Sequence, residues 1–274
     1  MVKFYDENYK EVYLPGDSRL HYGSIPLELT ISSIQMEKAG GKSKPVGRTA
    51  SLRGAIIASD DIDMDMKMDN VMAFLRRLGE FYVAKANTPF KLLKVEVLDS
   101  YDIEPGNGVL TEFVVPLNVL KPFYKQSLHT TGTIGTEGML FNNKWAYGMG
   151  TWFAENYWQY EFTGVKPTFF NAGDEEVKLI QQKESLITLK INAVPTNGLI
   201  DIDDGVTTFK LWYDFKAGDV LRIHGDKVTL NGVNVLGDTN FNFLTVKTGW
   251  NYWDIRGILN HDYECKIDFR YLYD

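Results

Sequence analysis

DNVMAFLRRLGEFY, residues 69–82, is the one stretch of this sequence with a clear helical pattern. Its apolar side chains recur every three or four residues, as they do on one face of a helix. These side chains are Val71, Phe74, Leu75, Leu78, Phe81 and Tyr82. Asp69 is placed to cap the first turn, and Arg76 and Arg77 fall on the opposite, hydrated face. The pattern predicts a helix over residues 69–84.

The segments on either side of this helix, residues 48–57 and 90–98, read as strands. Three or four turns of helix are not stable alone in water, so the apolar stripe must pack against a sheet. We therefore predict a mainly β fold, in which residues 1–128 form a β-sandwich-like domain that carries this single helix.

A polar, glycine-rich segment, EKAGGKSKPV at residues 37–46, joins two predicted strands. It cannot bury itself, so it is expected to protrude as a loop or as the tip of a hairpin. Two interpretations stay open: a plain solvated loop, or an arm that packs on a neighbouring subunit. The candidate interface residues are Lys38, Gly40, Gly41, Lys42 and Lys44.

Acidic and apolar residues alternate in SDDIDMDMKMD, residues 59–69. Carboxylates are good ligands for calcium, but the spacing lacks the central glycine and the closing glutamate of a calcium loop. We favour a half-buried edge segment with Met64, Met66 and Met68 pointing inward and the aspartates in water.

The second half of the chain, residues 129–274, is predicted to be an antiparallel β-sandwich. Short alternating runs are separated by tight turns such as Asp203-Asp204-Gly205 and Asn231-Gly232. Residues 125–138 are rich in Thr, Gly and Ser and are expected to form a linker or an extended surface segment. The aromatic segment 139–162 is expected to be an arm or an inserted strand pair.

The composition excludes several classes of protein. A net charge of −7 argues against a general nucleic-acid binder, which needs a basic face. One cysteine, Cys265, leaves no internal disulfide framework and suits a reducing cytoplasm. No apolar run approaches the roughly 20 residues needed to cross a bilayer, and the start of the sequence does not resemble a signal peptide. Membrane insertion is therefore not expected.

No catalytic set can be named. The four histidines lie in unrelated contexts, and no elbow-type serine, nucleotide fingerprint or metal-protease pair is present. Cys265 is expected to be a buried structural thiol. We expect no enzymatic activity, no metal and no cofactor. The one binding signal is aromatic: Trp250, Tyr252 and Trp253 could stack on sugar rings, although alternation puts Trp253 on the opposite strand face from the other two.

The order of features along the chain resembles the distal tail protein (Dit) family of long-tailed phages that infect Gram-positive bacteria. The N-terminal match comprises the glycine-rich tip, Arg48, Arg53-Gly54, the acidic stretch, the helix at 70–75, the strand at 92–98, Val115-Pro116 and Pro122-Phe123. The C-terminal match to the family's galectin-like sandwich comprises residues 170–175, 186–191, 216–223, 243–244 and 249–251. It is the ordered set, rather than any one motif, that carries the resemblance.

The resemblance implies a structural protein of the virion, located at the phage tail tip and assembled in the host cytoplasm. Six copies would form a ring that joins the tail tube protein to a tail-associated lysin or spike protein, and in some family members to receptor-binding proteins. DNA would pass through the channel, with Asp60, Asp61, Asp63 and Asp65 as a proposed lumen lining. The competing interpretations are a carbohydrate-binding module for host cell-wall polysaccharide and a wall-degrading enzyme.

Overall fold

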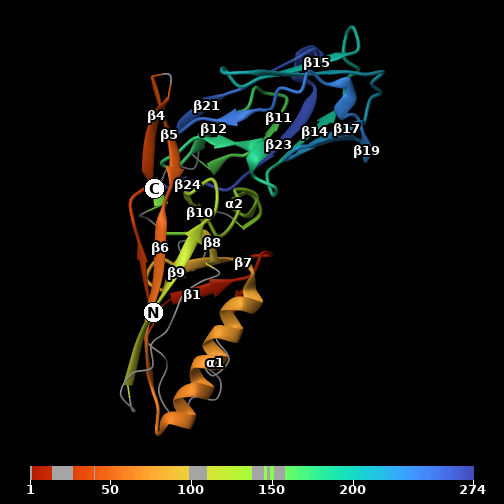
Figure 1. The fold of residues 1–274 in the computed structure, drawn as a ribbon. Helices are drawn as coiled ribbons and strands as arrows, with labels where there is room; N and C mark the ends of the chain where they lie inside the picture. The colour runs from red at the N-terminus through yellow and green to blue at the C-terminus, as the bar shows by residue number, and fades with distance from the viewer. Residues whose placement is uncertain are drawn as a thin grey trace. The chain divides into compact units, whose positions relative to one another are not determined.

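A computed structural model of the chain describes residues 2–13, 27–39, 41–98, 110–137, 145–146, 149–150 and 158–274. The chain divides into two compact units, Met1–Gln126 together with Asp274, and Ser127–Tyr273. Both are built mainly from antiparallel strands (Figure 1). The prediction of a mainly β fold is therefore confirmed.

Unit 1 contains a strongly bent antiparallel sheet in the order β2-β1-β7-β8-β9-β6-β3. The strands of this path are β1 (Val2–Tyr5), β2 (Glu11–Val12), β3 (Leu27–Ile31), β6 (Thr49–Ile57), β7 (Glu80–Lys85), β8 (Lys91–Val97) and β9 (Leu110–Val119). A separate two-stranded sheet is formed by β4 (Gln35–Ala39) and β5 (Lys42–Gly47).

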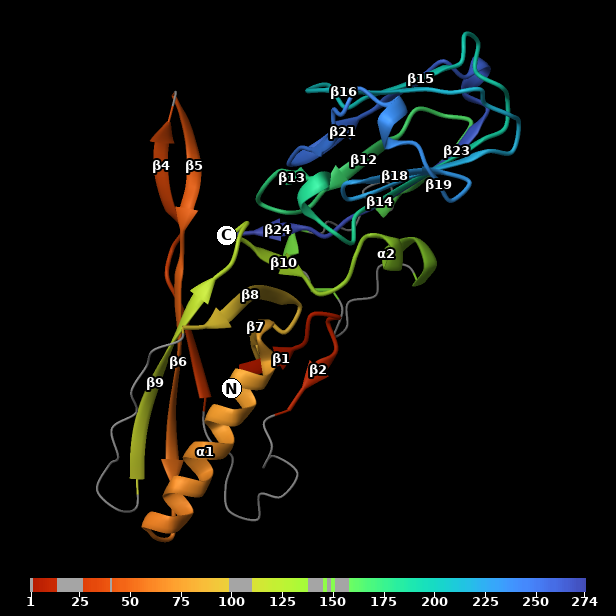
Figure 2. The ribbon, with the colours of Figure 1, turned by 45° about the vertical axis from the view of Figure 1, so that its right-hand side comes forward.

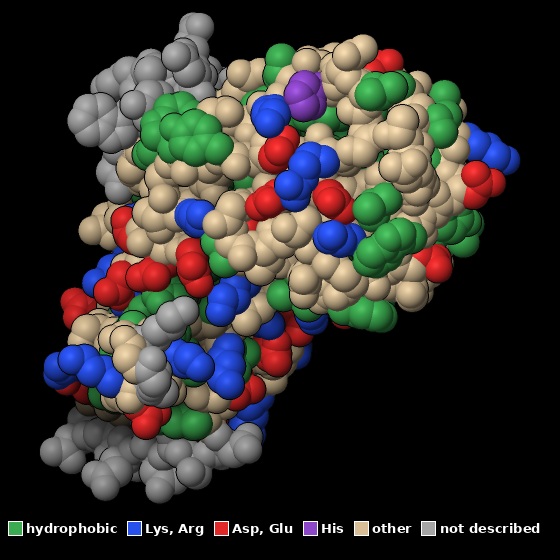
Figure 3. Space-filling view, turned by 90° about the horizontal axis from the view of Figure 1, so that it is seen from above, with side chains coloured by type: hydrophobic (Ala, Val, Ile, Leu, Met, Phe, Trp, Pro, Cys, Tyr) green, Lys and Arg blue, Asp and Glu red, His purple; other side chains and the backbone are tan. Residues whose placement is uncertain are grey.

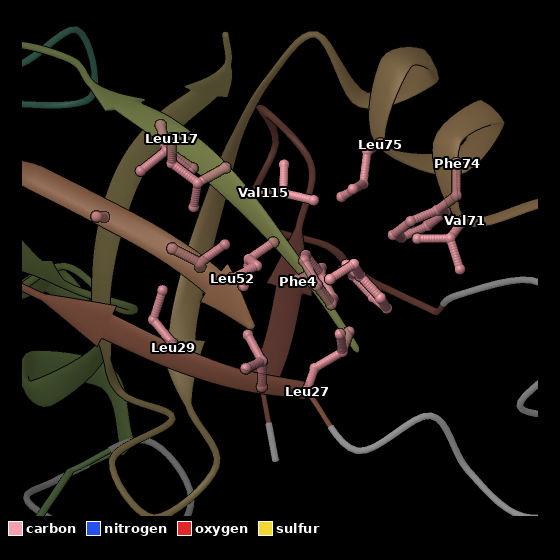
Figure 4. Packing of buried hydrophobic residues seen from close by; sticks show 14 of the residues in the cluster. Phe4, Leu27, Leu29, Leu52, Val71, Phe74, Leu75, Val115 and Leu117 are labelled. Carbon is pink, nitrogen blue, oxygen red and sulfur yellow. The ribbon is translucent and has the colours of Figure 1, made fainter. Parts of the chain in front are cut away.

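The long pair β6 and β9 shows why these residues form strands. Their register runs from Thr49 opposite Asn118 to Ile57 opposite Leu110. Along both strands every second side chain is buried, as the two-residue period requires. Figure 4 shows Leu52, Val115 and Leu117 from this pair pointing into one apolar cluster with Leu27 and Leu29 of β3.

The helix α1 (Asp61–Leu78) closes this cluster by burying Met64, Val71, Phe74 and Leu75. The rings of Phe74 and Phe4 meet edge to face with their centroids 5.4 Å apart. The prediction that an amphipathic helix packs its apolar stripe against a sheet is therefore confirmed (Figures 2 and 4).

The predicted bounds of the helix, 69–84, were wrong at both ends. Asp60, not Asp69, is the N-cap, and its side chain accepts a hydrogen bond from the Asp63 N–H at 2.8 Å. At the other end Gly79 has φ of 60°, which ends the helix, so that Phe81 and Tyr82 are buried in β7 instead.

The acidic stretch 59–69 is therefore mostly helical, and its prediction as an edge segment was wrong. Met64 is buried and Met68 packs partly against the core, whereas Met66 is 63% exposed. Positions 64, 68, 71 and 75 follow helical spacing, and the alternation of apolar residues at 62, 64, 66 and 68 only imitates the period of a strand.

Unit 2 contains two larger antiparallel sheets, in the orders β11-β23-β14-β17-β18-β19 and β16-β15-β22, with the strand pairs β12-β21 and β13-β20. The buried side chains alternate along β14, β15 and β17, so each larger sheet has one buried and one exposed face, as in a sandwich (Figure 2).

The strands of this unit are β10 (Lys125–Ser127, across the boundary), β11 (Glu161–Thr163), β12 (Thr168–Asn171), β13 (Val177–Lys178), β14 (Leu186–Ile191), β15 (Leu199–Asp203), β16 (Thr208–Trp212), β17 (Val220–His224), β18 (Lys227–Leu230), β19 (Val233–Asn234), β20 (Thr245–Val246), β21 (Gly249–Tyr252), β22 (Asp254–Arg256), β23 (Tyr263–Asp268) and β24 (Leu272–Tyr273). The helical elements are α2 (Gly132–Glu137), η3 (Leu179–Gln181), η4 (Leu236–Asp238) and η5 (Leu259–His261).

The stretch expected to be a linker, residues 125–138, is more ordered than its composition indicates. Ser127 and Thr131 are fully buried, and their N–H groups donate to the carbonyls of Tyr271 and Phe269. Most of the aromatic segment 139–162 lies outside the described residues. Within its described part Trp145 and Tyr160 are buried.

The helix-to-sheet contact can be tested with Leu75→Ala. We expect the free energy of unfolding to fall by about 3 kcal/mol, because Leu75 is 3% exposed and its removal leaves a cavity. Ile62→Ala, on the exposed face of the same helix, should change it by less than about 0.5 kcal/mol. Urea titration of both variants measures the difference, and equal losses would contradict the described packing.

Candidate functional site

An exposed hairpin, which we call the arm (residues 35–47), stands apart from the sheet of unit 1 (Figure 1). Its strands pair Glu37 with Lys44 and Lys38 with Ser43, and they turn back between Ala39 and Lys42. Gly41 has φ of 78°, which such a tight turn requires. The predicted protruding segment is thus a regular hairpin. Gly40 and the Lys42 side chain lie outside the described part of the chain.

Both faces of the arm are in water. Met36 is 51% and Val46 is 49% exposed, and Lys38 and Lys44 are exposed beside them. An isolated two-stranded hairpin is at best marginally stable, and large exposed apolar side chains add no stability to it. The arm therefore has the properties of a binding surface for another molecule.

The root of the arm is held firmly. The Ser32 N–H donates to the Thr49 carbonyl, and the Thr49 N–H donates to the Ser32 hydroxyl, both at 2.9 Å. Arg48 directly precedes Thr49, and its side chain is only 4% exposed. Its Nε donates to the Ser32 carbonyl at 2.8 Å, and one terminal nitrogen donates to the Phe123 carbonyl at 3.2 Å.

The charge of Arg48 is balanced by the Asp274 side chain, with 3.3 Å between nitrogen and oxygen. Burial lowers the pKa of Arg48 from its ordinary value and the Asp274 carboxylate opposes that shift, so the guanidinium stays charged. Sequence reasoning assigned Arg48 no role, because its three partners, Ser32, Phe123 and Asp274, come from separate parts of the chain. The only signal was a single arginine at the junction of a polar loop and an apolar strand.

The aspartates proposed as a lumen lining do not share one environment. Asp60 caps α1, and Asp63 binds Lys67 at 2.7 Å. The pKa of Asp63 is lowered by hydrogen bonds, first from Lys67 and then from the Ser59 N–H. Asp61 and Asp65 are exposed on the outer side of the helix. Among the described residues, no group of three or more acidic, histidine or cysteine side chains is arranged to hold a metal ion.

A second exposed surface lies on unit 2, where aromatic side chains meet. Trp250 packs on Phe170 with ring centroids 5.4 Å apart, and Tyr252 stacks beside Trp250 at an interplanar angle of 29°. Tyr252 is 68% exposed, whereas Trp253 is 1% exposed and packs on Phe169. The structure thus brings Trp250 and Tyr252 together and places Trp253 in the core.

Charged pairs occur on β22, the strand that follows β21 in the chain. Asp254 binds Lys166 at 2.8 Å, and Asp203 binds Arg256 at 3.0 Å. Figure 3 shows basic and acidic side chains close together on one face of the molecule, with hydrophobic groups among them. Such a mixed face could hydrogen-bond a polar ligand, but it lacks the geometry of a catalytic centre.

The remaining reactive side chains are not arranged for catalysis. Cys265 is buried, as predicted, and burial raises the pKa of its thiol to about 12. A thiol with that pKa is not a nucleophile at neutral pH. His224 lies in β17, His261 lies in η5, and His129 lies between β10 and α2. In the described residues no helix has the length and apolar character needed to cross a membrane.

Comparison with known proteins identifies the fold. Neither a protein-family model nor a curated protein sequence matches the chain. Among solved structures, the Dit protein of phage SPP1, described as a paradigm of the hub adsorption apparatus of phages that infect Gram-positive bacteria, matches with a TM-score of 0.59. The match has 9% sequence identity and covers 99% of this chain and 100% of that chain.

Two structures of the phage p2 baseplate in its activated conformation, with strontium and with calcium, match less well. Their TM-scores are 0.38 and 0.36 at 12% identity, and they cover 98% and 97% of this chain and 97% of each matched chain. The fold is therefore that of a phage Dit protein, and the resemblance seen in the sequence is confirmed at the level of the fold. The matched structures are of phage hub and baseplate proteins, not of enzymes.

Replacement of the arm's anchor, Arg48→Met, should lower the free energy of unfolding by about 3 kcal/mol, because two carbonyls and a carboxylate lose a buried partner. Tryptic cleavage after Lys38 should also become faster, because the base of the arm loosens. Arg53→Met removes an exposed arginine that forms a surface ion pair with Glu112, and it should leave the free energy of unfolding and the cleavage rate almost unchanged. Equal effects of the two variants would show that Arg48 is not the anchor.

Proposed function

We propose that this protein is a structural hub of a phage tail tip, and thus a component of the virion. The observation that carries the proposal is the fold shared with the SPP1 Dit protein over nearly the whole chain. The exposed arm supports it independently, because a hairpin with two uncovered faces suits a protein that works as one subunit of an assembly.

The assembly we propose is a closed ring of six copies formed by unit 1. An element that projects from one copy and packs on a different surface of the next makes a heterologous contact, and such contacts generate rings when the rotation closes. The arm, with Lys38, Gly40, Gly41, Lys42 and Lys44, is the proposed projecting element.

In this proposal the ring joins the tail tube protein on one side to a tail-associated lysin or spike protein on the other. Unit 2, the proposed galectin-like sandwich, projects outward and in some assemblies holds receptor-binding proteins. DNA crosses the central channel only in transit. The net charge of −7 supports this role, because an acidic wall does not retain DNA.

A second candidate function, recognition of cell-wall polysaccharide, is favoured by one observation. Trp250 and Tyr252 form a stacked aromatic surface, and Tyr252 is largely exposed. Aromatic faces of this kind can pack on the apolar faces of sugar rings. The hub proposal does not depend on this activity.

Ring formation is tested by the mass of the protein in solution, measured by light scattering over a range of concentrations. We expect a climb towards six times the 31.3 kDa of one chain. A variant in which residues 36–46 are replaced by a short Gly-Ser turn should remain a monomer, because it lacks the projecting element. A wild-type protein that stays monomeric at every concentration would contradict ring formation by the chain alone.

Sugar recognition is tested with Tyr252→Ala and binding to purified Gram-positive cell-wall polysaccharide. We expect affinity to fall by about tenfold, the equivalent of one aromatic contact. Trp212→Ala removes another exposed aromatic side chain of unit 2 and should leave binding unchanged. Protection of the Cys265 thiol from a labelling reagent shows that each variant is folded. Absence of binding by the wild-type protein would exclude this second function.

A further inference from the structure

The first relevant feature is the composition of the arm. Its register places Met36 opposite Pro45 and Lys38 opposite Ser43, so Met36 and Lys38 lie on the same face. Lys44 lies across the strand pair on the other face. The arm carries three lysines and one glutamate in an otherwise acidic chain, so it presents exposed apolar side chains within a positive field.

The second feature is the outer side of α1, which we call the acidic stripe: Asp61, Ile62, Asp65, Met66 and Asp69. Ile62 is 75% and Met66 is 63% exposed, although both are large apolar side chains. The three aspartates repeat every four residues, about 6 Å apart along the helix, and none forms an ion pair with a described residue.

This arrangement is unfavourable in the free chain. Like charges four residues apart destabilise a helix, and although the helix dipole favours Asp61 in the first turn, Asp65 and Asp69 lie beyond that turn. The apolar side chains between the aspartates remain exposed to water. Asp63, in contrast, has its lysine partner on the same helix. A partner that brings positive charge and apolar surface together would relieve both costs at once.

The arm has that composition but cannot reach the acidic stripe of its own copy. The arm joins the first residue of β6, Thr49, through Arg48. The helix α1 begins at Asp61, shortly after the last residue of β6, Ile57. Nine extended residues span about 30 Å. Figure 2 shows the arm and the start of α1 at opposite ends of β6. Two complementary surfaces at opposite ends of one rigid unit can meet only between copies.

We propose that the arm of one copy packs across the acidic stripe of a second copy, with Met36 beside Ile62 and Met66 and with Lys38, on the same face of the arm, beside Asp61, Asp65 and Asp69, while Lys44 on the other face adds to the positive charge of the arm. This inference rests on the proposed ring, and it identifies the arm and the acidic stripe as the two surfaces in contact between neighbouring copies. The contact is heterologous, because one patch meets a different patch, and it runs in one direction around a ring.

Charge reversal on each side tests the contact. The variants are K38E/K44E on the arm, D65K/D69K on the stripe, and the combination of all four. We expect self-association, followed by light scattering, to weaken by roughly 100-fold in each two-residue variant, because like charges then face each other. The four-residue variant should recover association. Association of the wild-type protein should weaken as salt is raised.

Two controls separate a specific contact from a change of net charge or a loss of folding. K183E/K227E changes the net charge as much as K38E/K44E does, at exposed lysines of unit 2, and should leave association unchanged. D61N/D65N/D69N removes the stripe's charge without introducing lysines, and it should weaken the salt dependence. Circular dichroism shows whether α1 is retained.

The outcomes are distinguishable. If the wild-type protein associates and the reversed variants associate equally well, the arm-to-stripe contact is wrong while the hub proposal stands, and the lumen-lining prediction for the aspartates is left in place. Failure of the four-residue variant to recover would also overturn the contact. A wild-type monomer at all concentrations would overturn both the ring formed by the chain alone and this contact.

Discussion

The burial of one helix stripe on one sheet is the constraint on which unit 1 depends. Val71, Phe74 and Leu75 supply the apolar surface that the inner faces of β6 and β9 need in order to leave water. Since a short helix and a bent sheet are each unstable alone, neither element would persist without the other. The contact also fixes which side of α1 remains outside, and therefore where the acidic stripe lies.

The strand β6 connects the arm to the helix that covers the sheet. It is paired on both sides, to β3 and β9, and it carries the arm at one end and the start of α1 at the other. Arg48 makes the junction with the arm rigid by using a buried charge to bind carbonyls from two other segments. The base of the arm is therefore fixed, although in the part of unit 1 that the structure describes Met36 and Val46 remain about half exposed.

Unit 2 separates its aromatic residues by strand alternation. Trp253 and Phe169 fill the interior, while Tyr252, the residue before Trp253, is exposed and stacks beside the partly exposed Trp250. Aromatic side chains thus stabilise the core on one face and form a candidate binding surface on the other. The buried Cys265 belongs to the first group, and its raised pKa reflects the dry interior in which it lies.

The sequence by itself determined what depends on local pattern: the mainly β class, the single long amphipathic helix, the protruding hairpin, the buried Cys265 and the split between Trp250 and Trp253. It could not determine the bounds of α1, because alternating methionines fit a strand and a helix equally well until Met64 is seen in the core and Met66 in water. Only the tertiary structure decided the role of Arg48 and the separation of the arm from the acidic stripe. Both depend on contacts between residues far apart in the chain, and local periodicity carries no information about such contacts.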